Sequence, residues 1–218
     1  VDLSINLDSS LYLDTRLLRA WAQEHLAGKR VLNTFAYTGS LGVAALAGGA
    51  SEVLQMDLNP RFLNLAKESY ALNGFPVRRS DFRAGDFWVL ASQLKRAGEL
   101  FDAVFVDPPF FSATPRGTVD LVAESHRVIN KVRPLVGHQG WLVTINNALF
   151  LSGADYTAML QSLCADGYLT LEAIIPVPPD FTGFPETVVG RLPVDPAPFN
   201  YSTKIAILRV RRKDQRTA

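Results

Sequence analysis

The sequence predicts an α/β protein with a doubly wound, mostly parallel sheet of seven strands. Short apolar runs that suit buried strands alternate along the chain with longer amphipathic stretches that suit helices, as in successive βαβ units. Several apolar runs stop abruptly at an acidic residue, which marks the end of a strand. At 218 residues, of which 48% are hydrophobic, the chain is large enough to cover both faces of such a sheet with helices.

The expected elements follow one another without an internal repeat. Strands are predicted near residues 30–35, 52–57, 76–80, 101–107, 139–145, 168–176 and 202–211. Helices are predicted over 14–27, 60–73, 154–165 and, as the longest, 116–136. Pro60 and Gly74 suit the two ends of the second helix. The proline-rich stretch 176–198 is irregular, and because loops of that length are usually functional or disordered, it is a candidate cover for the substrate.

These elements predict a single domain over residues 14–211, with a short strand-like lead-in at 1–13 and a basic tail at 212–218. A single cysteine excludes an internal disulfide framework and is compatible with a reducing compartment. No apolar run approaches the roughly 18 residues of a membrane span, and no signal peptide is visible. We therefore expect a cytoplasmic protein that does not enter a membrane.

The strand that ends at Asp107 is the most informative about function. Pro108 and Pro109 follow it, and then two aromatic residues, Phe110 and Phe111. Two prolines donate no N–H and hold a rigid, extended turn, so their acceptors are expected to face whatever binds at the mouth of the sheet. Ligands of open α/β sheets bind at the carboxyl ends of the strands. Rigid acceptors beside an aromatic platform suit a planar base, although a strand end with two core phenylalanines would have the same sequence.

Three further positions at strand ends complete this picture. Gly39 lies in a turn between a strand and an alanine-rich helix, where the backbone can approach a ligand closely. Asp57 ends the next strand and can accept from both hydroxyls of a ribose. Asp86, which precedes Phe87, can accept from an adenine amino group. The glycine turn alone is a weak signal, but in order with Asp107 the set predicts a site for S-adenosylmethionine beside a base-sized slot.

Three segments carry a resemblance to a known family. They are residues 12–16 (Tyr-Leu-Asp-Thr-Arg), 32–39 (Leu-Asn-Thr-Phe-Ala-Tyr-Thr-Gly) and 107–112 (Asp-Pro-Pro-Phe-Phe-Ser). They are similar to class I S-adenosylmethionine-dependent methyltransferases and, more narrowly, to the bacterial large-subunit rRNA methyltransferases of the RlmI and RlmK type. The resemblance implies a Rossmann-like methyltransferase fold with the last strand antiparallel, methyltransferase activity, S-adenosyl-L-methionine as cofactor and RNA as partner.

The resemblance and the strand-end pattern together assign candidate site residues. Cofactor binding is expected at Asn33, Phe35, Tyr37, Thr38, Gly39, Asp57, Leu58, Asp86, Phe87 and Asp107. Catalytic positioning is expected at Asp107, Pro108 and Phe110, and substrate binding at Phe110, Phe111 and Asn146. No metal is expected, because the three histidines are scattered and form no ligand pattern.

One departure from the family bears on the methylated atom. Relatives that methylate carbon 5 of cytosine resemble Ser-Cys-Ser after the fifth strand, where this chain has Thr144-Ile145-Asn146-Asn147. That segment looks more like the Ser-Asn-Asn of the RlmK branch, which the resemblance associates with guanine N7. Carbon 5 needs a thiolate to add to the ring, and the only cysteine, Cys164, lies on an apolar helix face typical of a core residue.

The leading hypothesis is therefore an rRNA methyltransferase that acts on a guanine nitrogen. Alternatives are methylation of an exocyclic amine of adenine or guanine in RNA or DNA, methylation of cytosine carbon 5, and a non-catalytic cofactor-binding module that binds RNA. The net charge of +1 is low for a strong nucleic-acid binder. Basic residues cluster only locally, at 78–83 and in the tail, where they would either meet phosphates or form a solvated surface.

Overall fold

A computed structural model describes residues 10–183 and 190–214. The strand-like piece expected at the start of the chain, part of the proline-rich stretch and the last residues of the basic tail lie outside these ranges.

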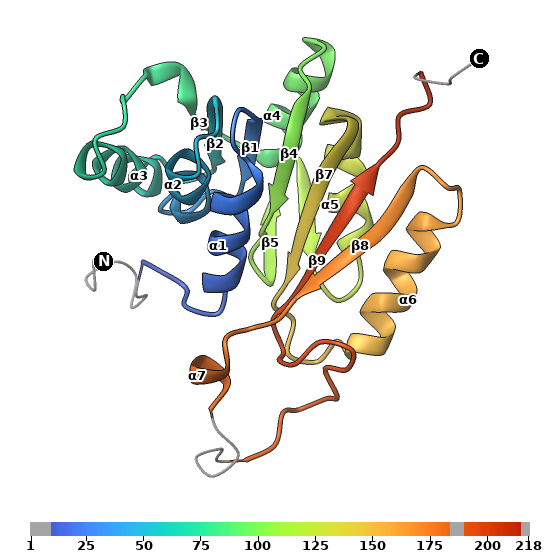
Figure 1. The fold of residues 1–218 in the computed structure, drawn as a ribbon. Helices are drawn as coiled ribbons and strands as arrows, with labels where there is room; N and C mark the ends of the chain where they lie inside the picture. The colour runs from blue at the N-terminus through green and yellow to red at the C-terminus, as the bar shows by residue number, and fades with distance from the viewer. Residues whose placement is uncertain (1–9, 184–189, 215–218) are drawn as a thin grey trace.

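The core of the molecule is one seven-stranded sheet with the order β3-β2-β1-β4-β7-β9-β8. Its strands are β1 (Arg30–Thr34), β2 (Glu52–Asp57), β3 (Phe82–Ala84), β4 (Phe101–Val106), β7 (Val136–Asn146), β8 (Leu169–Ile175) and β9 (Lys204–Val210). β9 pairs antiparallel with both β7 and β8, whereas the other pairings are parallel. Figure 1 shows β9 entering between these two strands against their direction. The predicted mostly parallel sheet with an antiparallel last strand is confirmed.

Helices cover both faces of the sheet. One face carries α1 (Arg16–His25), α2 (Ser40–Ala47) and α3 (Pro60–Leu72), and the other carries α4 (Phe87–Arg96), α5 (Ser125–Val132) and α6 (Gly153–Cys164). The two hydrophobic layers are separate because successive side chains of a strand point to opposite faces. The doubly wound arrangement is thus confirmed, and a further short helix, α7 (Pro179–Thr182), lies beneath the carboxyl end of the sheet (Figure 1).

Two expected elements were wrong. Residues 76–80 are exposed and form no strand. The third strand is instead β3, where the buried Phe82 pairs with β2. The long helix expected over 116–136 is replaced by a hairpin of β5 (Phe111–Thr114) and β6 (Gly117–Asp120), then α5, and β7 already begins at Val136. A turn at Pro115 and Gly117 breaks the helical pattern.

The sheet positions the candidate site by its strand order. The strand order reverses between β1 and β4: the strands that follow β1 in sequence lie on one side of it, and those that follow β4 lie on the other. In open α/β sheets a crevice forms at such a switch point, outside the carboxyl ends of the strands. The turns after β1, β2 and β4 therefore converge there.

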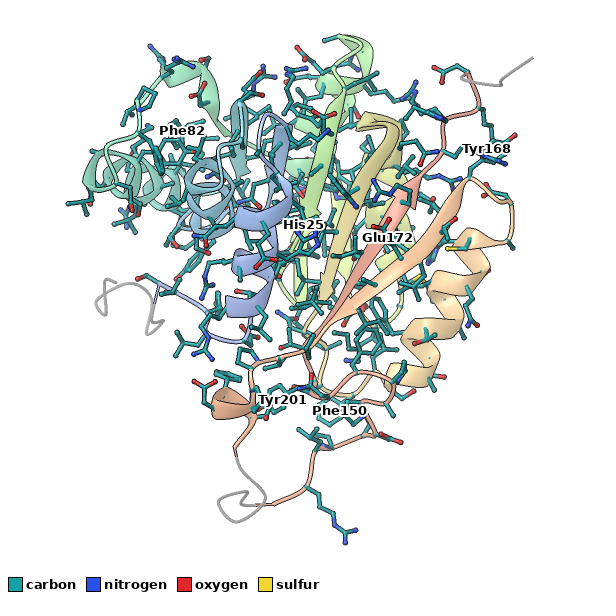
Figure 2. The ribbon with its side chains drawn as sticks, viewed as in Figure 1. His25, Phe82, Phe150, Tyr168, Glu172 and Tyr201 are labelled. Carbon is teal, nitrogen blue, oxygen red and sulfur yellow. The ribbon has the colours of Figure 1, made fainter. Side chains whose placement is uncertain are left out.

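The basic tail lies at the other end of the sheet, beyond the end of β9 (Figure 1). The described cations in and just before this tail have partners within the protein: Arg209 pairs with Glu172 at 2.6 Å and Arg212 with Asp214 at 2.7 Å. Tyr168, labelled in Figure 2 near the end of the described tail, packs beneath Arg211 and Lys213. Because these cations already have partners and lie away from the crevice, they favour a role in the structure of this surface over binding of phosphates next to the crevice.

Candidate active site

A cavity of about 250 Å³ occupies the crevice at the carboxyl ends of β1, β2 and β4. Its walls come from the segment before α1, the loops after these strands, the start of α4, the β5–β6 hairpin and the start of β9. Among the described residues that line it, four are aspartates and none is lysine, arginine or histidine: Asp14, Asp57, Asp86 and Asp107. A cavity of this charge favours a ligand that brings hydrogen-bond donors or positive charge.

Asp57 stands at the end of β2, as the sequence predicted. Its carboxylate accepts hydrogen bonds from the backbone N–H groups of Tyr37 and Asn59, both at 2.8 Å. Burial raises the pKa of Asp57, and these backbone N–H groups act in the opposite direction. Each carboxylate oxygen keeps a second lone pair, so Asp57 can still accept from a hydroxyl in the cavity.

The loop after β1 is held in an unusual backbone conformation. Phe35 and Tyr37 have positive φ angles of 54° and 50°, which non-glycine residues rarely adopt. The N–H of Ala36 donates to the carbonyl of Met56 on β2 at 2.7 Å and ties the loop down. Phe35, Ala36 and Tyr37 all line the cavity. Such strained residues cluster at ligand sites, where the surrounding structure holds them.

Two expected cofactor residues of the same turn face elsewhere. A Cβ added at Gly39 would lie 2.6 Å from the Cβ of Ala66 on α3, so this glycine serves the packing of two helices. Thr38 donates its hydroxyl to the carbonyl of Ser10 and is buried. Neither residue lines the cavity, and Ser40 does so instead.

Asn33 lines the cavity from the end of β1. Its amide nitrogen donates to Gln55 Oε1 at 2.8 Å, and its Oδ1 is buried without a hydrogen-bond partner among the described residues. An unpaired buried oxygen is costly, and a donor on a bound ligand would relieve that cost.

Asp86 joins the start of α4 to the β5–β6 hairpin. One carboxylate oxygen caps the helix by accepting from the N–H of Val89 at 3.1 Å, and the other accepts from the hydroxyl of Thr114. Phe87 follows, and its ring centroid lies 4.5 Å from that of Phe35. Asp86 and the two rings line the cavity with Leu58, so polar acceptors and flat apolar walls suit the base and ribose of a nucleoside.

Asp107 and Pro108 line the cavity where β4 ends. Burial, together with the nearby charge of Asp14, raises the pKa of Asp107 to about 7. Among the described residues its carboxylate receives no hydrogen bond. This group is a desolvated acid with unused acceptor capacity, which is typical of a ligand-binding position.

The two phenylalanines after the prolines lie outside the cavity wall. Phe110 is 48% exposed and Phe111 57%, although Pro109 and Ser112 on either side of them line the cavity. They are therefore not core residues.

The expected base contact at Asn146 needs correction. Its side chain is fully buried and bonds to the carbonyl of Leu121, the hydroxyl of Ser125 and the N–H of Ala148, because it braces the turn after β7. The neighbouring Asn147 is exposed and lines the cavity.

Sequence reasoning missed several lining residues. Asp14 and Tyr12 belong to the segment that carried the family resemblance, so a signal was available. Thr203 sits at the start of β9, and nothing in the local sequence marks it. Of the hairpin residues that line the cavity, Gly117 and Val119 fell within the wrongly expected helix, and Ser112 and Thr114 precede it.

Residues 1–184 match the family described as S-adenosylmethionine-dependent methyltransferase. The chain belongs to this family. The chain is 35% identical over 149 residues to the ribosomal RNA large subunit methyltransferase K/L of Marinobacter nauticus, and the match covers 67% of this chain and 21% of that protein. It is 32% identical over 173 residues to the ribosomal RNA large subunit methyltransferase I of Photobacterium profundum, covering 77% of this chain and 43% of that protein. The chain thus spans less than half the length of these relatives.

Solved structures share the fold of this methyltransferase. The protein SMU.776, crystallised with SAH, superposes with a TM-score of 0.79 at 22% identity, covering 92% of this chain and 50% of that chain. A SAM-dependent methyltransferase from Agrobacterium tumefaciens gives a TM-score of 0.66 at 20% identity, covering 94% and 64%. At these identities the likeness supports the fold alone.

The cofactor of this family is S-adenosylmethionine, and the cavity suits it. Its carboxylates can accept hydrogen bonds from a ribose and from an amino-acid group, and its aromatic side chains suit an adenine ring. Asn33 Oδ1 and Asp14 Oδ1 are buried without a hydrogen-bond partner among the described residues, so each can accept from a ligand. Within the described ranges, no group of three or more His, Cys, Asp or Glu is placed to hold a metal ion. Nor does any helix in those ranges have the length and apolarity needed to cross a membrane.

Proposed function

We propose that this methyltransferase modifies a guanine ring nitrogen of large-subunit rRNA in the cytoplasm. The observation that carries the proposal is the exposed Phe110 beside the Asp107-Pro108-Pro109 turn, at the edge of the cofactor cavity. Two relatives named as ribosomal RNA large subunit methyltransferases support the choice of rRNA.

In this proposal, one set of residues binds the cofactor and another positions the base. When bound, S-adenosylmethionine supplies an electrophilic methyl group on a sulfonium. Asp57, Asn33 and Asp86 hold and orient it from the β2, β1 and α4 sides of the cavity. The carbonyls of Asp107 and Pro108 position the base edge, and much of the rate enhancement comes from this alignment. Guanine N7 already carries a free lone pair, so its methylation needs no base to remove a proton.

Phe110 supplies the stacking platform, with Phe111 beside it. A base within a duplex cannot reach such a site and must be single-stranded or flipped out. Stacking a base on an aromatic ring contributes about 1–3 kcal/mol. Asn147 replaces Asn146 as the side chain that reads the base edge, because it faces the cavity and carries both a donor and an acceptor.

The absence of a thiol from the cavity disfavours cytosine carbon 5. Cys164 ends α6, packs against the core and lies outside the cavity lining. Burial raises the pKa of its thiol, which opposes formation of a nucleophilic thiolate. An exocyclic amine remains the second candidate, because the desolvated Asp107 is an acceptor for N–H groups.

Two measurements test this function. Nucleoside mass spectrometry of rRNA from a strain lacking the gene should show loss of one methylated guanine, and loss of a methylated adenine or cytosine instead would overturn the assignment. With tritiated S-adenosylmethionine, Phe110→Ala should lower turnover on that RNA by tenfold or more with cofactor affinity unchanged. Leu72→Ala, which removes an exposed apolar side chain on α3, serves as the control. Wild-type turnover in Phe110→Ala would exclude Phe110 as the platform.

A further inference from the structure

Four basic side chains from two helices meet on the outer surface of α4 and α5. Lys95 and Arg96 end α4, and Arg127 and Lys131 lie on α5. The two helices contact each other and lie behind the sheet in the view of Figure 1. Because two separate segments supply these cations, no run of basic residues in the sequence marks the surface that they form. We call it the α4–α5 patch.

Lys131 is held in place between the two helices. Its ammonium donates to Ser92 Oγ on α4 at 2.6 Å and lies 5.7 Å from the centroid of the Trp88 ring. Lys95 and Arg96 follow Ser92 at the i+3 and i+4 positions of the helix, which lie on the same side one turn further along. The three cations are therefore neighbours.

The positive charge of the α4–α5 patch is largely uncompensated. Burial lowers the pKa of Lys131, and so do the charges of Lys95 and Arg96, whereas the charge of Asp86 acts in the opposite direction. Of the four cations, only Arg127 forms an ion pair with a carboxylate of the residues that the structure describes. Neighbouring like charges repel one another, and an anion placed between them removes that repulsion. The patch is thus suited to an anionic partner.

The patch begins at the wall of the cofactor cavity. Trp88, in the first turn of α4, lines the cavity, and the charged groups of Arg127 and Lys131 lie 5.6 and 5.7 Å from its ring centroid. The β5–β6 hairpin reaches the same ring, because a Cβ added at Gly117 would lie 2.5 Å from it. This hairpin starts directly after Phe110. The proposed base platform, the hairpin and the patch therefore follow one another along the surface.

The length and the position of the patch favour a polynucleotide as the partner. α4 has ten residues and is about 15 Å long, and its cations lie from beside its middle to its end. Such a row suits a series of anions better than a single one, and a nucleic acid strand carries one phosphate per nucleotide. An acidic protein surface would match the same charges. However, the patch starts beside a slot for a base, and a base in that slot is attached to a phosphodiester backbone.

We propose that the α4–α5 patch binds the phosphate backbone of the substrate RNA on one side of the methylated nucleotide. Lys95, Arg96 and Lys131 contact the phosphates. Lys131 is already oriented by Ser92 and keeps further N–H donors for an anion. Contacts to the backbone position the RNA and carry no sequence information, so the base slot remains the part that selects the nucleotide. This inference rests on the proposed RNA substrate and is independent of which atom is methylated.

The salt dependence of RNA binding tests the patch on the full chain. Fluorescence anisotropy with a labelled oligouridylate, measured over a series of KCl concentrations, reports how many phosphates the protein neutralises. For single strands the slope of log K against log salt is about −0.7 per phosphate contact. The variant Lys95→Gln/Arg96→Gln/Lys131→Gln should therefore have a slope shallower by about 2, and its affinity at 0.1 M KCl should fall about tenfold to hundredfold.

A second cluster of three arginines provides the matched control. Arg78→Gln/Arg79→Gln/Arg83→Gln removes the same number of charges from exposed side chains at the β3 edge of the sheet. This variant should keep the wild-type slope. Both variants should bind S-adenosylhomocysteine as the wild type does, because none of the six residues lines the cavity.

Each other result overturns the proposal. Equal losses in the two triple variants would mean that only the overall charge of the protein matters. Unchanged RNA binding in the patch variant would favour an acidic protein surface as the partner. Wild-type protein that binds no RNA at any salt concentration would refute the patch and the proposed RNA substrate together, whereas wild-type binding with an unchanged slope in the patch variant would refute the patch alone.

Single variants keep the test decisive if the triple variant is unstable, since Lys131 is half-buried. Lys95 and Arg96 are exposed in the last turn of α4, where glutamine is well tolerated in a helix. Lys95→Gln and Arg96→Gln should each make the slope shallower by about 0.7. Lys95→Arg keeps the charge and should keep the slope, and a loss in that variant would show that the position matters for a reason other than its charge.

Discussion

At the scale of single residues, Asp57 supports the loop after β1 and also lines the cavity, where we expect it to bind the ligand. It already accepts from the backbone of Tyr37 and Asn59, so its loss would release the loop as well as the ribose hydroxyls. Asp57→Ala should weaken S-adenosylmethionine binding by roughly 1–3 kcal/mol, because hydroxyls on the ligand are left unpaired. Calorimetry measures this directly, and unchanged affinity would exclude Asp57 from the site.

The half-buried, desolvated acid Asp107 makes the stability of the cofactor-free protein depend on pH. Its pKa is about 7 in the folded protein and near 3.8 when exposed. The folded form therefore binds the proton more tightly, and the stability that this contributes is complete below about pH 4 and is lost as the pH rises through 7. Asp107→Asn should raise the melting temperature more at pH 8 than at pH 5. An equal change at both pH values would show that Asp107 ionises normally.

Cys164 is the residue on which the choice between nitrogen and carbon methylation depends. It ends α6 outside the cavity lining, so Cys164→Ala should retain methyl transfer. A modest loss of stability is expected from the small cavity left in the packing. A folded but inactive variant, or an RNA adduct trapped through this sulfur, would favour cytosine carbon 5 instead.

At the scale of elements, the β5–β6 hairpin forms one wall of the site. The Thr114 hydroxyl donates to Asp86, and a Cβ added at Gly117 would lie 2.5 Å from the Trp88 ring, so the hairpin packs directly on α4. Thr114→Val should weaken cofactor binding several-fold by freeing both the hairpin and Asp86. Thr118→Val, on the paired strand, is the matched control. Equal effects of the two changes would show that the hydroxyl is not the anchor.

The elements that sequence reasoning recovered are those with a strong local signal. Strands that end at Asp57 and Asp107 are apolar runs closed by an acid, and both acids line the cavity as expected. The hairpin was missed because each strand has only four residues, too few to show a strand period beside a helix-like pattern. Asn146 was wrongly expected to face the cavity, because neighbouring side chains of a strand point to opposite sides, and Asn147 lines the cavity instead.

Other parts of the site depend on contacts between distant segments, which no local pattern reveals. Thr203 reaches Asp14 across 189 positions of sequence. Gly39 was predicted from its turn as a ligand-binding glycine, and nothing in its local sequence indicates that it also lies against α3, where an added Cβ would be 2.6 Å from the Cβ of Ala66.

At the scale of the whole molecule, the residues that line the cavity come from segments between the residues before α1 and the residue before β9. Ligand binding should therefore stabilise the domain as one unit. At a hundredfold excess over its Kd, S-adenosylhomocysteine should add about 2.7 kcal/mol to the free energy of unfolding. For a domain of this size that corresponds to a rise in Tm of about 5–10 °C. Differential scanning calorimetry should show a single transition that moves upward as a whole. A second transition that stays in place when ligand is added would contradict this, because part of the domain would then unfold independently of the cavity.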